Sequence, residues 1–91
     1  MARARVVRAF YLESRNAWAV EIDDLEGIVR AGQQATFTVA ADNIGPYLIL
    51  GVEFSDHLPE RTSTVALMVQ ASRKRGLDRF IGGTVETTDP L

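Results

Sequence analysis

The chain has 91 residues, 46% of them hydrophobic, which is the size and composition of one globular domain. It contains no cysteine, so a disulfide framework and thiolate catalysis are both excluded. Its apolar runs are far shorter than the roughly 20 residues of a membrane-spanning helix, and its basic start lacks the apolar region of a signal peptide. We therefore expect a soluble cytoplasmic protein with no membrane segment.

The net charge of −2 hides an uneven distribution of charged residues. Residues 1–10 and 71–79 are basic, whereas residues 11–70 carry nine acidic residues against three arginines. An acidic body of this kind would attract a basic partner, while the basic ends would contact an anionic one. Chance clustering of solvated charges is the alternative interpretation.

The first two predicted strands lie at residues 5–12 and 17–23. Residues 5–12 are rich in β-branched and aromatic side chains. In residues 17–23 an apolar row alternates with a more polar one, as on a half-buried strand, and the apolar row is Trp18, Val20 and Ile22. The polar segment 13–16 is turn-prone and predicts a hairpin between the two strands.

Residues 23–32 predict a second turn and a third strand. Asp23 to Gly27 collects turn-forming residues around a single apolar side chain. Residues 28–32 then restart a β-branched run that ends at a glycine. The expected product is a three-stranded antiparallel meander.

Residues 33–52 fit two different structures. Apolar residues from Phe37 to Tyr47 recur at intervals of three and four, which is typical of one face of a helix. The alternation in residues 36–39 instead favours a pair of strands, and Pro46 would interrupt a helix interior. We predict a helix that is kinked near Pro46, with a pair of strands as the alternative.

A fourth strand is predicted at residues 62–69, with apolar side chains on both faces. We expect a basic segment at residues 71–81 and a flexible tail at residues 82–91. The predicted fold class is α+β, with the meander, the kinked helix and the fourth strand in one domain of residues 1–70. The apolar fourth strand also predicts a homodimer or a higher even-numbered oligomer.

The strand and turn from Trp18 to Gly27 resemble a motif of the HicB-like antitoxins. The matching residues are Trp18, Val20, Ile22, Asp24, Leu25 and Gly27. The resemblance covers about residues 4–70 and implies a truncated, partial ribonuclease-H-like fold. It also implies that the chain neutralises a small basic HicA-like toxin that cleaves messenger RNA.

Four carboxylates form an acidic rim around the second predicted turn, and we expect them to bind such a toxin. They are Glu21, Asp23, Asp24 and Glu26. An acidic surface can pair with the lysines and arginines that hold RNA, and so block the substrate electrostatically. The protein-binding surface is therefore predicted at this rim.

No catalytic residue, metal site or cofactor is predicted. The acidic rim lacks a second acidic strand end with which to hold Mg²⁺. Ser55, Asp56 and His57 have the residue types of a hydrolytic triad, but consecutive positions do not readily form its geometry, so His57 is interpreted as a loop residue. We predict a binding protein and not an enzyme.

The alternative function is that of a small nucleic-acid-binding regulator. The candidate phosphate contacts are Arg3, Arg5, Arg73, Lys74 and Arg75. Aromatic residues do not interleave with them along the chain, as they do in many proteins that bind single strands. Nucleic acid is therefore the secondary predicted partner.

Overall fold

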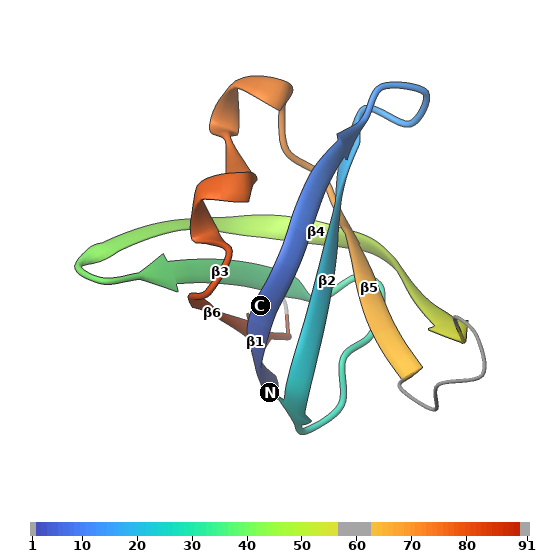
Figure 1. Cartoon of the computed structure of the whole chain (residues 1–91). Helices are drawn as coiled ribbons and strands as arrows, with labels where there is room; N and C mark the ends of the chain where they lie inside the picture. Colours follow the sequence, from blue (N-terminus) through green and yellow to red (C-terminus); the bar gives the residue numbers. More distant parts are fainter. Residues whose placement is uncertain (1, 57–62, 90–91) are drawn as a thin grey trace.

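A computed structural model describes residues 2–56 and 63–89 of the chain. Six antiparallel strands close into a barrel in the order β1-β2-β5-β4-β3-β6 (Figure 1). The strands are β1 (Ala2–Leu12), β2 (Ala17–Glu26), β3 (Gln34–Val39), β4 (Asp42–Asp56), β5 (Ser63–Val69) and β6 (Thr84–Thr88). Two 3-10 turns, η1 (Arg73–Arg75) and η2 (Leu77–Phe80), lie between β5 and β6. Within these ranges, no helix is long and apolar enough to cross a membrane.

Large and small side chains together fill the barrel interior. β1 turns Ala2, Ala4 and Val6 inward and its arginines outward, because successive side chains of a strand point to opposite faces. Phe37 of β3 and Phe80 of η2 are fully buried, with ring centroids 6.2 Å apart. The 3-10 turn η2 therefore belongs to the core and packs against β1 and β3.

The predicted α+β fold is wrong, because the segment expected to form a kinked helix forms β3 and most of β4. A turn at residues 40–41 folds this segment back on itself, so Phe37 pairs with Ile44 and Ala35 pairs with Tyr47. The spacing that suggested a helix face therefore comes from neighbours on two strands. The described residues contain no α-helix, so the partial ribonuclease-H-like fold is also wrong.

The predicted meander is correct only in its first hairpin. β1 and β2 pair as expected, with Leu12 opposite Ala17. Residues 28–32, expected as the third strand, form an irregular connection, and β2 pairs on its other side with β5 (Figure 1). The predicted fourth strand corresponds to β5, while His57 and the first residue of the predicted segment 62–69 lie outside the described residues.

Residues 82–91, predicted as a flexible tail, include the strand β6. β6 pairs with β1 on one side and with β3 on the other, which closes the barrel. Val85 and Thr87 of β6 point into the core and are each 1% exposed. The barrel therefore extends well beyond the predicted domain of residues 1–70.

The Thr87 hydroxyl is buried and has no hydrogen-bond partner among the described residues. Thr87→Val keeps the shape of the side chain and removes the unsatisfied hydroxyl, so we expect the free energy of unfolding to rise by about 1 kcal/mol. Urea denaturation measures this change. Thr84→Val, on the same strand but only half-buried, is the control and should have little effect. A loss of stability in Thr87→Val would contradict the expectation.

Candidate functional site

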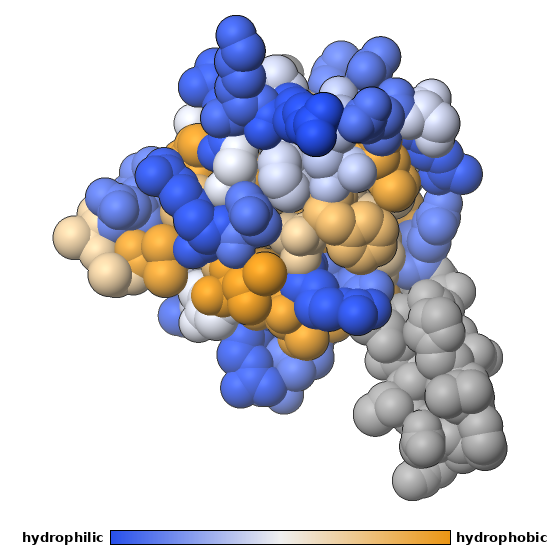
Figure 2. Space-filling model, turned by 45° about the horizontal axis from the view of Figure 1, so that its top comes forward, coloured by the Kyte–Doolittle hydropathy of each residue, from blue (hydrophilic) through white to orange (hydrophobic). Residues whose placement is uncertain are grey.

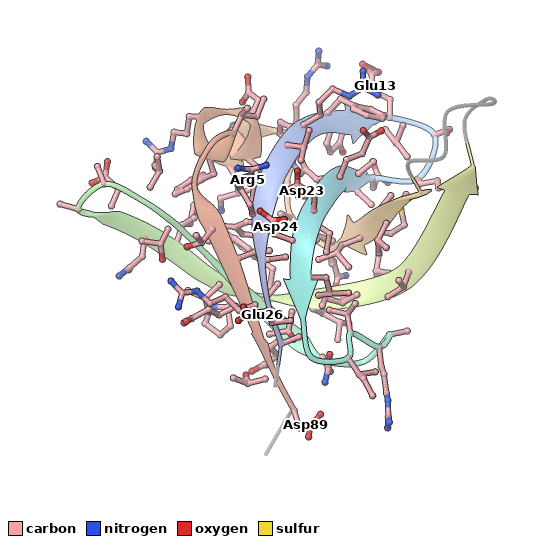
Figure 3. The ribbon with its side chains drawn as sticks, turned by 60° about the horizontal axis from the view of Figure 1, so that its bottom comes forward. Arg5, Glu13, Asp23, Asp24, Glu26 and Asp89 are labelled. Atoms are coloured by element: carbon pink, nitrogen blue, oxygen red, sulfur yellow. The ribbon has the colours of Figure 1, made fainter. Side chains whose placement is uncertain are left out.

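The predicted acidic rim lies on β2, but arginines of β1 occupy most of its carboxylates. Arg5 binds Asp23 through hydrogen bonds of 3.0 and 2.8 Å, and Arg8 binds Glu21 through two of 3.0 Å. Arg5 also lies 3.8 Å from Asp24 (Figure 3). The strand register causes this pairing, because it sets Arg5 opposite Asp23 and Arg8 opposite Glu21. The rim is therefore not a free acidic surface.

The titration of the two arginines reflects the same contacts. The hydrogen bonds to Asp23, and then the charges of Asp23 and Asp24, raise the pKa of Arg5 above its ordinary value. The hydrogen bonds to Glu21 and its charge raise the pKa of Arg8 in the same way. Of the four predicted carboxylates, only Glu26 makes no ion pair within residues 2–56 and 63–89.

The five predicted phosphate contacts fall at opposite ends of β1. Arg3 and Arg5 lie near its start, whereas residues 73–75 lie near its end, where the Arg73 guanidinium is 5.9 Å from the centroid of the Tyr11 ring. The strand from Arg3 to Tyr11 spans about 26 Å. The two basic segments therefore do not form one surface, and Arg5 is already paired with an acidic residue.

A hollow of about 460 Å³ opens beside η1, at the end of the barrel that β1 reaches. Its lining consists of Tyr11, Asn16, Tyr47, Gln70, Ala71, Ser72 and Arg75. Figure 2 turns the η1 end of the molecule toward the reader, and on this face hydrophilic, pale and hydrophobic surfaces lie next to one another. We name this hollow the η1 hollow. It combines two aromatic rings, two amide side chains and one guanidinium group from four segments of the chain.

Hydrogen bonds and ring contacts hold one wall of the η1 hollow. Trp18 Nε1 donates to the backbone oxygen of Ser72 at 2.9 Å. The Trp18 ring meets the Tyr11 ring edge-on, with centroids 5.7 Å apart. The Tyr11 hydroxyl in turn donates to Asn16 Oδ1 at 3.2 Å. The Tyr11 ring therefore packs against Trp18 while its hydroxyl reaches the exposed side chain of Asn16.

The charge at the rim of the η1 hollow is positive. Arg73 donates to Glu13 at 3.0 Å, so its charge is compensated. Lys74 and Arg75 are exposed and make no ion pair in the part of the chain that the structure describes. Arg75 lines the hollow together with the two tyrosines, and Lys74 precedes it in η1.

Sequence reasoning did not find the η1 hollow, because its residues are far apart along the chain. The β3–β4 hairpin positions Tyr47. The backbone N–H of Gln70 donates to the backbone carbonyl of Leu48 at 2.8 Å and so holds the segment after β5. Asn16 ends the β1–β2 turn with a positive φ of 50°. No local pattern links these positions, so only the predicted basic residues Arg73, Lys74 and Arg75 pointed to this end of the barrel.

The sequence-based reason for a dimer is weaker in the structure. That reason was an outer apolar row on β5, but Met68 is only 6% exposed within the single chain. Large apolar side chains that are exposed lie elsewhere, including Phe10 of β1, Leu50 of β4 and Ile28 in the connection after β2. The even-numbered oligomer stays a prediction.

Two further findings concern the site and the relatives of the chain. In the described ranges, no group of three or more His, Cys, Asp or Glu side chains could hold a metal ion.

No protein-family model matches the chain, and no curated protein or solved structure matches it either. The resemblance to the HicB-like antitoxins therefore stays a prediction.

Proposed function

We propose that the protein is a non-catalytic binding module that holds a single strand of nucleic acid at the η1 hollow. The observation that carries the proposal is that Tyr11 and Tyr47 line the same hollow as Arg75. Aromatic rings stack on bases of any sequence, and neighbouring cations attract the phosphates. Proteins that bind single strands without strong sequence preference combine these same two features.

The dimensions of the η1 hollow suit a unit the size of a nucleotide. It has a volume of about 460 Å³ and is open to solvent, so a base would stack on its lining without being enclosed. One nucleotide would occupy the hollow, and the adjoining phosphates would lie along the exposed turn that carries Lys74 and Arg75. A free mononucleotide shares this chemistry, so the binding experiment has to compare it with a strand.

The antitoxin hypothesis draws less support from the geometry. A basic toxin would need free carboxylates, yet Glu21 and Asp23 each bind an arginine of the same chain through two hydrogen bonds. Each pair is charge-neutral, so the rim presents less net negative charge to a basic toxin than the sequence suggested. The hypothesis retains its sequence motif and Glu26, and it remains second to nucleic-acid binding.

Arg75→Gln tests the electrostatic part of the proposal. Each phosphate contact with a single strand contributes a slope of about −0.7 to the logarithm of affinity against the logarithm of salt concentration. We expect wild type to bind a labelled strand of about ten nucleotides more tightly than a mononucleotide. Arg75→Gln should reduce the magnitude of the slope by about 0.7. Fluorescence anisotropy over a range of salt concentrations measures both quantities.

Arg30→Gln is the matched control, because it removes the same charge elsewhere. Arg30 is exposed and lines a separate hollow with Ile28 and Asp89. We expect its salt dependence to equal that of wild type. The proposal would be wrong if no single strand bound saturably, or if the two variants changed the slope equally.

A further inference from the structure

We infer that the protein forms a homodimer in which Phe10 of each copy inserts into a hollow on the outer surface of the other copy. The inference is independent of nucleic-acid binding. Each described strand has a neighbour on both sides, so the closed barrel offers a second chain no strand edge with which to pair. A second copy must therefore dock through outward-facing side chains.

The receiving hollow lies at the pairing of β4 with β5 and has a volume of about 210 Å³. Its lining consists of Arg15, Ala17, Leu50, Gly51, Glu53 and Met68, and we name it the β4 hollow. It is open to solvent, so a ring could enter from outside. An apolar cavity of about 150 Å³ can hold benzene, so the β4 hollow has room for one phenyl ring.

Phe10 lies on the same stretch of outer surface as the β4 hollow. Its ring points outward from β1 and is 44% exposed, whereas its neighbour Ala9 belongs to the core. Phe10 pairs with Ala19 of β2, and Ala19 pairs on its other side with Met68 of β5, which lines the hollow. These three strands lie side by side in Figure 1. Two strand spacings of about 4.8 Å therefore separate Phe10 from the edge of the hollow.

A projecting ring and a recess on one surface are self-complementary. A two-fold axis that passes between them would place the ring of each copy over the β4 hollow of the other, because a two-fold contact uses the same patch twice. Met68 would then meet the incoming ring, and the sulfur of methionine makes favourable contacts with aromatic rings. The surface supplies both halves of the contact, so a second copy of the chain fits it.

The charges that border this surface also favour a second copy. Arg15 Nη1 lies 3.1 Å from Glu53 Oε2 at the wall of the β4 hollow. Arg8 Nη2 lies 3.0 Å from Glu21 Oε2, next to the pair of Phe10 and Ala19. Both pairs are neutral, so two copies of the surface would not repel each other. A charged partner such as nucleic acid would gain no attraction here.

Sedimentation equilibrium of the full chain tests the inference. We expect the average mass of wild type to rise with concentration and to level off at two chains, within a range that reaches about 300 μM. Because the bordering charges are paired within each copy, the dissociation constant should depend only weakly on salt. A wild type that stays monomeric throughout this range would overturn the inference.

Two variants disrupt the contact from opposite sides. Phe10→Ser removes the projecting ring. Gly51→Leu fills the β4 hollow, and the strand should accept it because a Cβ at Gly51 would meet no atom within 4 Å. We expect each variant to raise the dissociation constant of the dimer by about tenfold or more, as for a central contact of an interface.

Mixing the two variants separates the proposed contact from general stickiness and from misfolding. Phe10→Ser keeps an open hollow and Gly51→Leu keeps its ring, so one of the two contacts can form in the mixed dimer. The mixture should therefore associate more tightly than either variant alone. Ile28→Ser is the control, because Ile28 is 63% exposed and lies outside this surface, and its dissociation constant should equal that of wild type. The inference would be refuted if Ile28→Ser weakened association as much as Phe10→Ser, or if mixing restored nothing.

Discussion

Replacing Gly83 with alanine is expected to destabilise the barrel by about 3 kcal/mol or more. Gly83 is buried, and a Cβ there would overlap the Thr38 carbonyl oxygen and lie 3.0 Å from Val39 Cβ. Thr38 pairs with Thr84 of β6, so β3 cannot move aside without disturbing the strand pair that closes the barrel. The Gly83 amide and carbonyl also bond to Phe80 and Val6, at 2.8 and 2.9 Å.

Urea denaturation followed by circular dichroism measures the effect of Gly83→Ala. Gly51→Ala is the matched control, because a Cβ at Gly51 would meet no atom within 4 Å. We expect its stability to stay within about 1 kcal/mol of wild type. A wild-type midpoint for Gly83→Ala would show that β3 does not approach Gly83 as closely as the structure has it.

Replacing Tyr47 with leucine is expected to weaken single-strand binding by about tenfold or more. Stacking of one base on an aromatic side chain contributes about 1–3 kcal/mol, and about 1.4 kcal/mol corresponds to a factor of ten. Tyr47 is half-buried and lines the η1 hollow. Leucine keeps most of the apolar contact with the core while removing the ring, so the fold should persist.

Tyr47→Phe is the matched control for the loss of the ring. It keeps the ring and removes only the hydroxyl, so its affinity should stay close to that of wild type. Anisotropy titrations at one fixed salt concentration compare the three proteins, and circular dichroism checks that each is folded. Equal affinities for the leucine and phenylalanine variants would remove stacking from the binding mode and with it the main support for the proposed function.

The sequence by itself determined the β1–β2 hairpin and the strand β5. In these segments the signal is local: β1 is rich in β-branched and aromatic residues, β2 carries an apolar row at every second position, and β5 is apolar on both faces. The row of Trp18, Val20 and Ile22 is buried as predicted, with exposures of 5% or less, but Ala17 and Ala19 of the row expected to be more polar are buried as well. The distribution of charged residues along the chain can also be read from the sequence, because it does not depend on which strands pair.

Only the tertiary structure decided what residues 33–52 and 84–88 become. A helix can form from local contacts alone, whereas a strand needs a neighbour. β3 has an adjacent neighbour in β4, but its other neighbour, β6, is distant in sequence, and both neighbours of β6 are distant from it. The five residues of β6 have an alternating pattern but are too short to form a strand without β1 and β3. Residues 84–88 therefore form a strand only because the barrel closes.

Tertiary structure also decided which surfaces are available for binding. The acidic residues of β2 looked like a free rim in the sequence, but the register places Arg5 and Arg8 opposite two of them. The η1 hollow is the converse case. Tyr11 and Tyr47 are far apart in the sequence and line the same hollow only in the folded barrel. The charge or the aromatic ring of a residue can be read from the sequence directly. Which side chains form ion pairs or line the same hollow depends on the strand register, and the register depends on the whole fold.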